Sequence, residues 1–182
     1  NFQYMKDIQL TVVKDLSKLR AVNSAGSQDD DAQTSFTILK SIDRGAMGEI
    51  LTAKDNQLGR TVAFKKIHEH VAKIPSYLER FFMEAQVTAQ LEHPNIVPVY
   101  QMKIDGNNAG YAMKLIHGKT LGVLIAETKK QLEKYGKLGK RHNLSARLEH
   151  FLKVCDAMHY AHRKGVIHRD LKPQNVMVGS FN

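Results

Sequence analysis

One eight-residue segment constrains this chain more than any other part of it: His168-Arg169-Asp170-Leu171-Lys172-Pro173-Gln174-Asn175. A carboxylate, an amine and an amide stand close together there, on Asp170, Lys172 and Asn175. Phosphoryl transfer needs one group that orients the attacking hydroxyl, one that neutralises the phosphate and one that binds magnesium. We therefore predict that Asp170 accepts the hydroxyl proton, Lys172 contacts the phosphate and Asn175 binds Mg²⁺. A polar surface turn would not account for the presence of His168 and Pro173 at fixed positions in the same segment.

A second signal is a lysine inside an apolar strand, Val62-Ala63-Phe64-Lys65. A lysine in such a strand is costly to bury unless it is paired. Glu84 lies on the helix expected next, and an ion pair with it would hold Lys65 on the α- and β-phosphates of a nucleotide. Taken alone, each residue is equally well explained as a surface charge.

A glycine-bearing turn precedes that strand, Asp43-Arg44-Gly45-Ala46-Met47-Gly48-Glu49-Ile50. It aligns with G-x-G-x-x-G-x-V, in which Gly45 and Gly48 take the second and third glycine positions and let backbone N–H groups approach phosphates. Asp43 replaces the first glycine and would weaken nucleotide binding unless Arg44 or solvent offsets its charge. Ile50 replaces the valine and still offers an apolar roof for an adenine.

Alternating apolar residues predict five strands and three helices in the part of the chain that follows residue 35. The strands are expected at 36–42, 49–54, 61–67, 97–104 and 109–116, and the helices at 76–91, 120–135 and 145–164. Ser76 and Glu79 form a capping-box pattern at the start of the first helix. Its inner side is expected to carry Leu78, Phe81, Phe82, Ala85, Thr88 and Ala89. The fold class is therefore α+β, with one helix inserted after the third strand of an antiparallel sheet.

The first 35 residues have a different character. Ile8, Val12, Leu16 and Leu19 recur at helical spacing within 1–22, and 23–35 are small, polar and acidic. We predict an amphipathic helix followed by a linker. Because the chain begins with Asn1 rather than Met, we expect it to be a piece of a longer protein.

Charge and composition exclude several classes of protein. The net charge is +9, but only Tyr135 interleaves the basic residues of 129–141, which argues against a nucleic-acid surface. No apolar run approaches the roughly 20 residues of a membrane helix, and no secretory signal is visible. The single cysteine, Cys155, cannot form an internal disulfide; we expect a buried thiol and a cytoplasmic protein.

Two histidine pairs, His68 with His70 and His159 with His162, have the spacing of metal ligands. Neither pair has a cysteine or carboxylate at motif spacing to serve as a third ligand. A zinc site is therefore not favoured, and His168 is expected to brace the loop that contains it.

Together these motifs resemble the bacterial branch of the eukaryotic-type, or Hanks-type, serine/threonine protein kinases. The resemblance covers about residues 36–182 and includes His93-Pro94-Asn95-Ile96 after the first helix. It implies a protein-kinase-like fold with an N-lobe at 36–116 and a hinge and partial C-lobe at 117–182, preceded by the helix and linker of 1–35. Lys172, two residues after Asp170, is typical of the serine/threonine form, and Arg169 suggests control by a phosphorylated activation loop.

The resemblance also implies ATP and Mg²⁺ as cofactors and a Ser/Thr-bearing protein as substrate. Met113 takes the gatekeeper position, and Lys114–His117 is the expected hinge, whose backbone would bind adenine. The residues expected to bind the nucleotide are Gly45, Gly48, Ile50, Ala63, Lys65, Glu84, Met113, Lys114 and Ile116.

The family pattern next requires an Asp-x-Gly magnesium ligand, and the chain reaches Asn182 without one. We therefore expect this 182-residue piece, truncated just after the catalytic loop, to have little kinase activity alone. The alternative is a truncated pseudokinase that binds nucleotide or regulates a partner. Helix 145–164 would then present Leu148, Phe151, Leu152, Val154, Cys155 and Met158 without the lobe that encloses them in the family. Another chain (self-association), the 1–22 helix or residues outside this sequence would have to cover that face.

Overall fold

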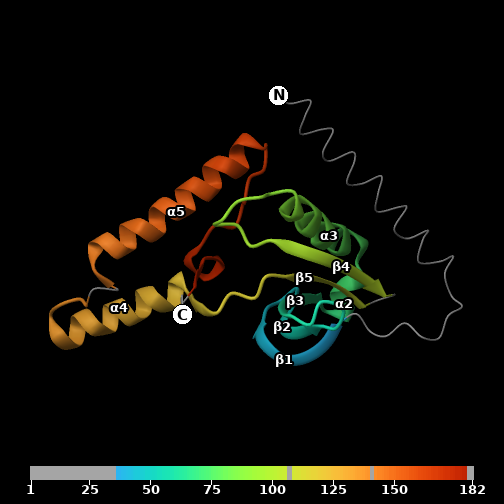
Figure 1. Ribbon diagram of the computed structural model, residues 1–182, viewed down its shortest axis with the longest axis horizontal. Helices are drawn as coiled ribbons and strands as arrows, with labels where there is room; N and C mark the ends of the chain where they lie inside the picture. The colour runs from blue at the N-terminus through green and yellow to red at the C-terminus, as the bar shows by residue number, and fades with distance from the viewer. Residues whose placement is uncertain (1–35, 106–107, 140–141, 180–182) are drawn as a thin grey trace, which may run out of the picture. The chain divides into compact units, whose positions relative to one another are not determined.

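The computed structural model describes residues 36–105, 108–139 and 142–179 (Figure 1). The predicted helix at 1–22 and linker at 23–35 lie outside these ranges. The described chain divides into two compact units, residues 36–92 with 97–115 and residues 93–96 with 116–179.

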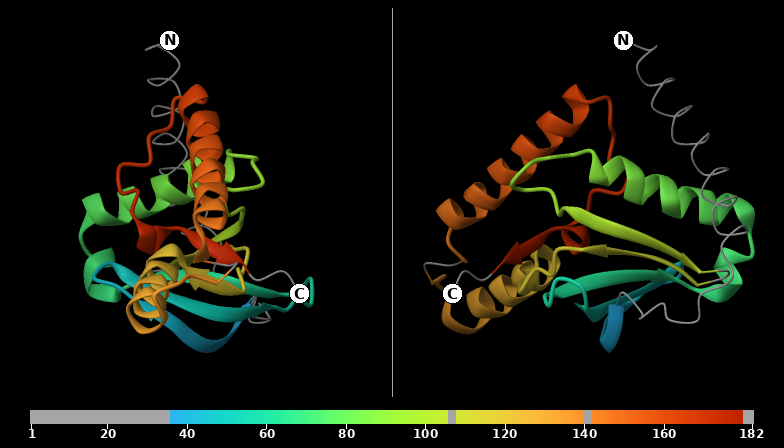
Figure 2. Two further views of the ribbon diagram at one scale, coloured as in Figure 1. Left: turned by 90° about the vertical axis from the view of Figure 1, so that its left-hand side faces the viewer. Right: turned by 45° about the vertical axis from the view of Figure 1, so that its right-hand side comes forward.

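The first unit is built on a five-stranded antiparallel sheet in the order β1-β2-β3-β5-β4 (Figure 2). Its strands are β1 (Phe36–Arg44), β2 (Gly48–Asp55), β3 (Thr61–Ile67), β4 (Val99–Asp105) and β5 (Asn108–Met113). The predicted five-stranded sheet is confirmed. The fifth strand ends at Met113 rather than Ile116, because no partner strand continues beyond the pairs that Met113 makes with Ala63 and Val99 in the described sheet.

Two helices follow β3: the short α2 (Glu69–Ala72) and α3 (Pro75–Ala89). The predicted capping box at Ser76 is wrong. Ile74 is the N-cap of α3 and, in the described structure, makes no side-chain cap hydrogen bond. Pro75 takes the first helical position, which suits proline because its missing N–H would have no helical partner there. Ser76 therefore already lies inside the helix.

Helix α3 packs on one face of the sheet through Phe81, Phe82 and Ala85, which are buried as predicted. Leu78 is partly buried against them, whereas Ala89 at the end of the helix is exposed, contrary to the prediction. The other face of the sheet holds a second apolar cluster of Phe36, Leu51, Ala53, Val62, Phe64 and Ala112. Burial on both faces explains why Val62, Ala63 and Phe64, three consecutive residues of β3, are all apolar.

The second unit contains β6 (Gly118–Thr120), α4 (Leu121–Tyr135), α5 (Leu144–Arg163), the 3₁₀ turn η2 (Pro173–Asn175) and β7 (Met177–Gly179). The two predicted helices are confirmed to within one residue at their ends. The Thr120 hydroxyl accepts from Val123 N at the start of α4, and the Asn143 amide oxygen accepts from Ala146 N at the start of α5. Gly136 ends α4 with a φ of 65°, which glycine adopts without strain.

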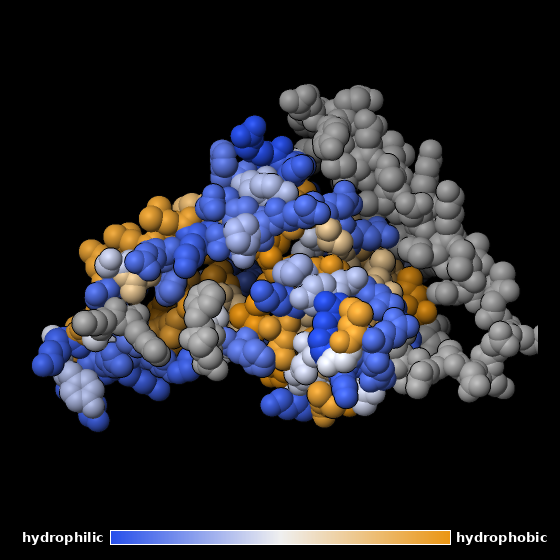
Figure 3. All heavy atoms as spheres, viewed as in Figure 1, coloured by the Kyte–Doolittle hydropathy of each residue, from blue (hydrophilic) through white to orange (hydrophobic). Residues whose placement is uncertain are grey.

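One face of α5 is apolar and exposed (Figure 3). Leu148, Phe151 and Leu152 are 50%, 61% and 63% exposed, as expected for a helix face without a partner. The prediction of a buried Cys155 thiol is wrong: Cys155 is exposed, because it lies at helical spacing from Leu148, Phe151 and Leu152. What covers this face stays a prediction. Among the residues that the structure describes, no helix is long and apolar enough to cross a membrane.

Candidate active site

The first group of predicted site residues lies around an ion pair in the first unit. Lys65 of β3 contacts Glu84 of α3, with 2.6 Å between Nζ and Oε1. The contact is the one that the sequence predicts for an otherwise unpaired lysine in an apolar strand. The Lys65 ammonium also lies 5.8 Å and 5.6 Å from the ring centroids of Phe81 and Tyr111, within the range of cation–π attraction.

Strand register gathers the other predicted nucleotide contacts of this unit on the same face of the sheet. Lys65 is paired with Ile50 of β2 and with Tyr111 of β5, and Ala63 is paired with Met113. Directly paired residues of antiparallel strands point to the same side, and residues two apart in one strand do so too. Ile50, Ala63, Lys65 and Met113 therefore share one face, a relation that depends on which strands pair.

The glycine-bearing turn joins β1 to β2, and Gly45 N donates to Gly48 O over 2.9 Å. A side chain on Gly48 would collide with the carbonyl oxygen of Lys66, whereas a Cβ on Gly45 would have Gly48 O as its nearest neighbour at 3.8 Å. The Asp43 carboxylate accepts from the backbone N–H of Arg44 over 2.9 Å. Arg44 thus contacts this carboxylate through its main chain, and the offset of the Asp43 charge stays a prediction.

His68 contacts the same turn, and the sequence did not point to this role. Its Nε2 lies 3.0 Å from Gly45 O, and its backbone N–H donates to Met47 O over 3.0 Å. The ring also stacks on His70 at 5.5 Å between centroids. In the described part of the chain, no group of three or more His, Cys, Asp or Glu residues could hold a metal ion.

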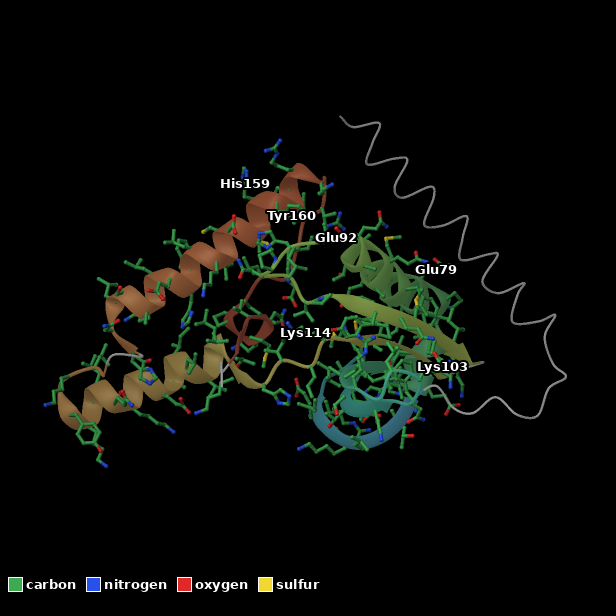
Figure 4. All side chains as sticks on the ribbon, viewed as in Figure 1. Glu79, Glu92, Lys103, Lys114, His159 and Tyr160 are labelled. Atoms are coloured by element: carbon green, nitrogen blue, oxygen red, sulfur yellow. The ribbon has the colours of Figure 1, made fainter. Side chains whose placement is uncertain are left out.

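The predicted hinge, Lys114–His117, follows β5 and lies outside regular secondary structure. Lys114, labelled in Figure 4, donates its backbone N–H to Pro98 O over 3.1 Å. Ile116 belongs to the second unit, so the chain passes from one unit to the other within this segment.

The second group of predicted residues, Asp170, Lys172 and Asn175, meets in the second unit. Asp170 Oδ2 accepts from Lys172 Nζ and from Asn175 Nδ2, both over 2.9 Å. The hydrogen bond from Lys172 has the larger effect and that from Asn175 the next largest, and together they hold the pKa of Asp170 below its ordinary value of 3.8. The carboxylate is therefore ionised at neutral pH, as a proton acceptor must be.

The loop that carries these residues is held at both ends. Asp170 N donates to His168 Nδ1 over 3.3 Å, which fits the predicted bracing role of His168. Asn175 N donates to Lys172 O over 2.9 Å, and Leu121 N, at the start of α4, donates to Val176 O over 2.8 Å. Beyond η2, β7 pairs with β6, and these elements were too short to be predicted from apolar periodicity.

Arg169, between His168 and Asp170, has a φ of 63°. A residue with a Cβ rarely adopts this left-handed conformation, and such strain is concentrated at functional sites.

The donor chemistry of both groups fits the nucleotide and the metal that the motifs imply. The amide oxygen of Asn175 is a hard oxygen ligand of the kind that Mg²⁺ prefers. The Lys65 ammonium and the backbone N–H groups of the glycine-bearing turn suit phosphate oxygens. Each group is assembled within its own unit.

Comparison with known proteins agrees with the resemblance to protein kinases that the motifs indicate. Residues 36–181 match the protein kinase domain family. The serine/threonine-protein kinase PknD of Protochlamydia amoebophila is 41% identical over 150 residues, which are 80% of this chain and 15% of that protein. The protein of the same name from Chlamydia muridarum is 39% identical over 146 residues, 80% of this chain and 16% of that protein.

A solved structure agrees at the level of the fold. The PknI kinase domain of Mycobacterium tuberculosis superposes with a TM-score of 0.62 at 24% identity, over 81% of this chain and 56% of that one. This chain therefore belongs to the protein kinase family, and the two relatives above are bacterial serine/threonine-protein kinases.

Proposed function

We propose that this chain forms the nucleotide-binding unit and the catalytic loop of a kinase that transfers the γ-phosphoryl group of ATP to serine or threonine hydroxyls of proteins. The observation that carries the proposal is the Asp170 carboxylate, bonded at once to Lys172 and Asn175. The Lys65–Glu84 ion pair in the first unit supports it.

The first unit would bind ATP. Backbone N–H groups of Gly45 and Gly48 would face the phosphates, and Lys65, oriented by Glu84, would contact the α- and β-phosphates. The apolar side chains of Ile50, Ala63 and Met113, which share a face of the sheet with Lys65, would contact the adenine. The backbone of Lys114 and Ile116 would hydrogen-bond the adenine edge.

The second unit would carry the transfer step. The Asp170 carboxylate orients the substrate hydroxyl and accepts its proton as the oxygen attacks the γ-phosphorus. Lys172 neutralises charge on the transferred group, and the Asn175 amide oxygen is a ligand for Mg²⁺. Bound Mg²⁺ supplies charge neutralisation on the phosphates, which is the largest contribution in this class of reaction.

The chain spans 15% and 16% of the length of the two PknD relatives, so substrate and regulation belong to the whole protein. Residues 176–182 contain no Asp-x-Gly. We expect the 182-residue chain to transfer phosphate far more slowly than the full-length protein.

The experiment that tests the proposal is phosphate transfer from ATP to a Ser/Thr-containing protein by the full-length protein. Replacing Asp170 by Ala should lower kcat about a hundredfold or more, the range expected for loss of a general base. ATP affinity should change little, because Asp170 contacts the hydroxyl rather than the nucleotide. Equal rates for wild type and variant would contradict the assigned role of Asp170.

A second candidate is a pseudokinase that binds nucleotide without transferring phosphate. The observation in its favour is Asp43, an exposed carboxylate at the position of the first glycine in the phosphate-binding turn. ATP binding by the full-length protein without measurable transfer would support this candidate over an active kinase.

For its cellular location we propose the cytoplasm, because the single cysteine cannot form an internal disulfide.

A further inference from the structure

Tyr111 of β5 is buried, with 4% of its surface exposed, and belongs to the apolar cluster that contains Phe81 and Phe82 of α3. A phenol hydroxyl that leaves water costs free energy unless it finds a hydrogen-bond partner. The Tyr111 hydroxyl donates to Oε1 of Glu84 over 2.9 Å. The side chain is therefore both a core residue and a polar contact to α3.

The hydrogen bond reaches the same oxygen atom that pairs with Lys65. Glu84 Oε1 accepts from Lys65 Nζ over 2.6 Å and from the Tyr111 hydroxyl over 2.9 Å. The Lys65 ammonium also lies 5.8 Å and 5.6 Å from the ring centroids of Phe81 and Tyr111. Glu84 is thus held from two sides by one cation and one neutral donor.

The position of the hydroxyl is set by packing. The ring of Tyr111 lies 5.2 Å from that of Phe81, between centroids, and its strand register places it directly opposite Lys65. Buried rings packed in this way keep one orientation. Burial raises the pKa of Tyr111 well above its ordinary value of 10.0, and the charge of Glu84 adds to the shift, so the hydroxyl remains a donor throughout the physiological pH range.

Glu84 itself has freedom to move. Its side chain is 53% exposed, against 27% for Lys65. An exposed ion pair is weak, because water competes for both partners and fixing long side chains costs entropy. A second, rigid donor on the same carboxylate oxygen reduces that freedom.

We propose that Tyr111 is a positioning residue of the phosphate-binding site: its hydroxyl holds the Glu84 carboxylate in the orientation that pairs with Lys65. This inference rests on the proposed role of Lys65 in binding nucleotide. The alternative is that Tyr111 only fills the core, in which case its ring matters and its hydroxyl does not.

The test is Tyr111→Phe in the full-length protein, which removes the hydroxyl and keeps the ring. The matched control is Tyr77→Phe, which removes the hydroxyl of a tyrosine in α3 that is 40% exposed. The first measurement needs no nucleotide: the rate at which acetic anhydride acetylates Lys65, followed by mass spectrometry. Because the ion pair shields the amine, Tyr111→Phe should raise this rate about threefold to tenfold, the range of a net hydrogen bond, and Tyr77→Phe should not.

The second measurement is steady-state kinetics. In Tyr111→Phe the KM for ATP should rise about threefold to tenfold while the KM for the protein substrate stays unchanged. A purely structural defect would lower the active fraction and leave both KM values alone. In a Glu84→Ala background, Tyr111→Phe should have no further effect, because the group it positions is gone.

The inference is overturned if Lys65 is acetylated at the wild-type rate in Tyr111→Phe, or if the effects of Tyr111→Phe and Glu84→Ala are additive. Absence of ATP binding in the wild-type protein would instead contradict the proposed function. The acetylation rates would still decide whether Tyr111 holds the ion pair.

Discussion

Gly45 and Gly48, two glycines in one short turn, differ in the space around their Cα atoms. Gly48 lies where β2 begins to pair with β3, opposite Ile67, and a Cβ there would collide with the main chain of Lys66. Gly45 has room for a Cβ. The motif treats the two glycines alike, but packing makes glycine a requirement of the fold only at position 48.

Replacing each glycine by alanine separates these two roles. Gly48→Ala should lower the free energy of unfolding by about 1–3 kcal/mol, the usual cost of overpacking a closely packed site. Gly45→Ala should change it by less than about 0.5 kcal/mol, because its Cβ has space. Urea unfolding of both variants measures the difference, and equal losses would contradict it.

The side chain of His68 is bonded to the glycine-bearing turn, with 3.0 Å between its Nε2 and Gly45 O. His68→Ala should speed amide hydrogen exchange at residues 45–48 about twofold to tenfold, as expected for the loss of one net hydrogen bond. His68→Gln, which keeps an N–H donor, should restore much of the protection. His70→Ala is the matched control, and faster exchange in that variant would show that ring stacking, rather than the bond to Gly45, orders the turn.

At the scale of a structural element, the turn between β2 and β3 is organised by one carboxylate. Asp55 accepts from the backbone N–H groups of Gln57 and Leu58 and from Arg60 Nε over 3.1 to 3.2 Å. Burial opposes ionisation of Asp55, but these hydrogen bonds prevail and its pKa lies below the ordinary 3.8. The charged form of Asp55 therefore stabilises the folded turn.

Because the pKa of Asp55 is lowered, its contribution to the free energy of unfolding depends on pH in a defined direction. The stabilisation from Asp55 is fully present above pH 3.8 and is lost as the pH falls through the lower folded-state pKa. Asp55→Asn should therefore be less stable than wild type at pH 7, with a gap that narrows once the pH drops below 3.8. Unfolding free energies at both pH values give the comparison, and a gap independent of pH would count against the charge of Asp55 as the cause.

At the scale of the whole molecule, each unit contains one of the two groups of residues that we propose for phosphoryl transfer. The first unit has the lysine, the glutamate and the glycine-bearing turn, and the second has Asp170, Lys172 and Asn175. The whole molecule also has an exposed apolar surface, the face of α5 that carries Leu148, Phe151 and Leu152. Large apolar side chains left in water forfeit about 1.5–3 kcal/mol each, so a cover for this face would stabilise the protein.

The exposed face of α5 should be detectable in the isolated 182-residue chain. We expect it to bind a dye that reports apolar surface, or to self-associate, and Phe151→Ser with Leu152→Ser should reduce either effect. The free energy of unfolding should change by less than about 1 kcal/mol, because both side chains are more than half exposed. A monodisperse chain without dye binding would show that this face is covered already.

Local sequence pattern and the spacing of residues along the chain were sufficient to predict a large part of this structure. The five strands, the helices α3, α4 and α5, and the segment from His168 to Asn175 were all predicted, because periodicity and short motifs act within a few residues. The Lys65–Glu84 pair followed from the cost of an unpaired buried amine. These features determined the family and the residues proposed for its chemistry.

Tertiary structure alone decided what depends on residues far apart in sequence. Tyr111 reaches Glu84 because β5 pairs with β3, and His68 reaches Gly45 because α2 begins beside the turn. The exposure of Cys155 likewise depends on which face of α5 finds a partner, which apolar periodicity does not specify. The sequence by itself determined which groups we propose for the chemistry, and strand pairing and packing decided how those groups are held.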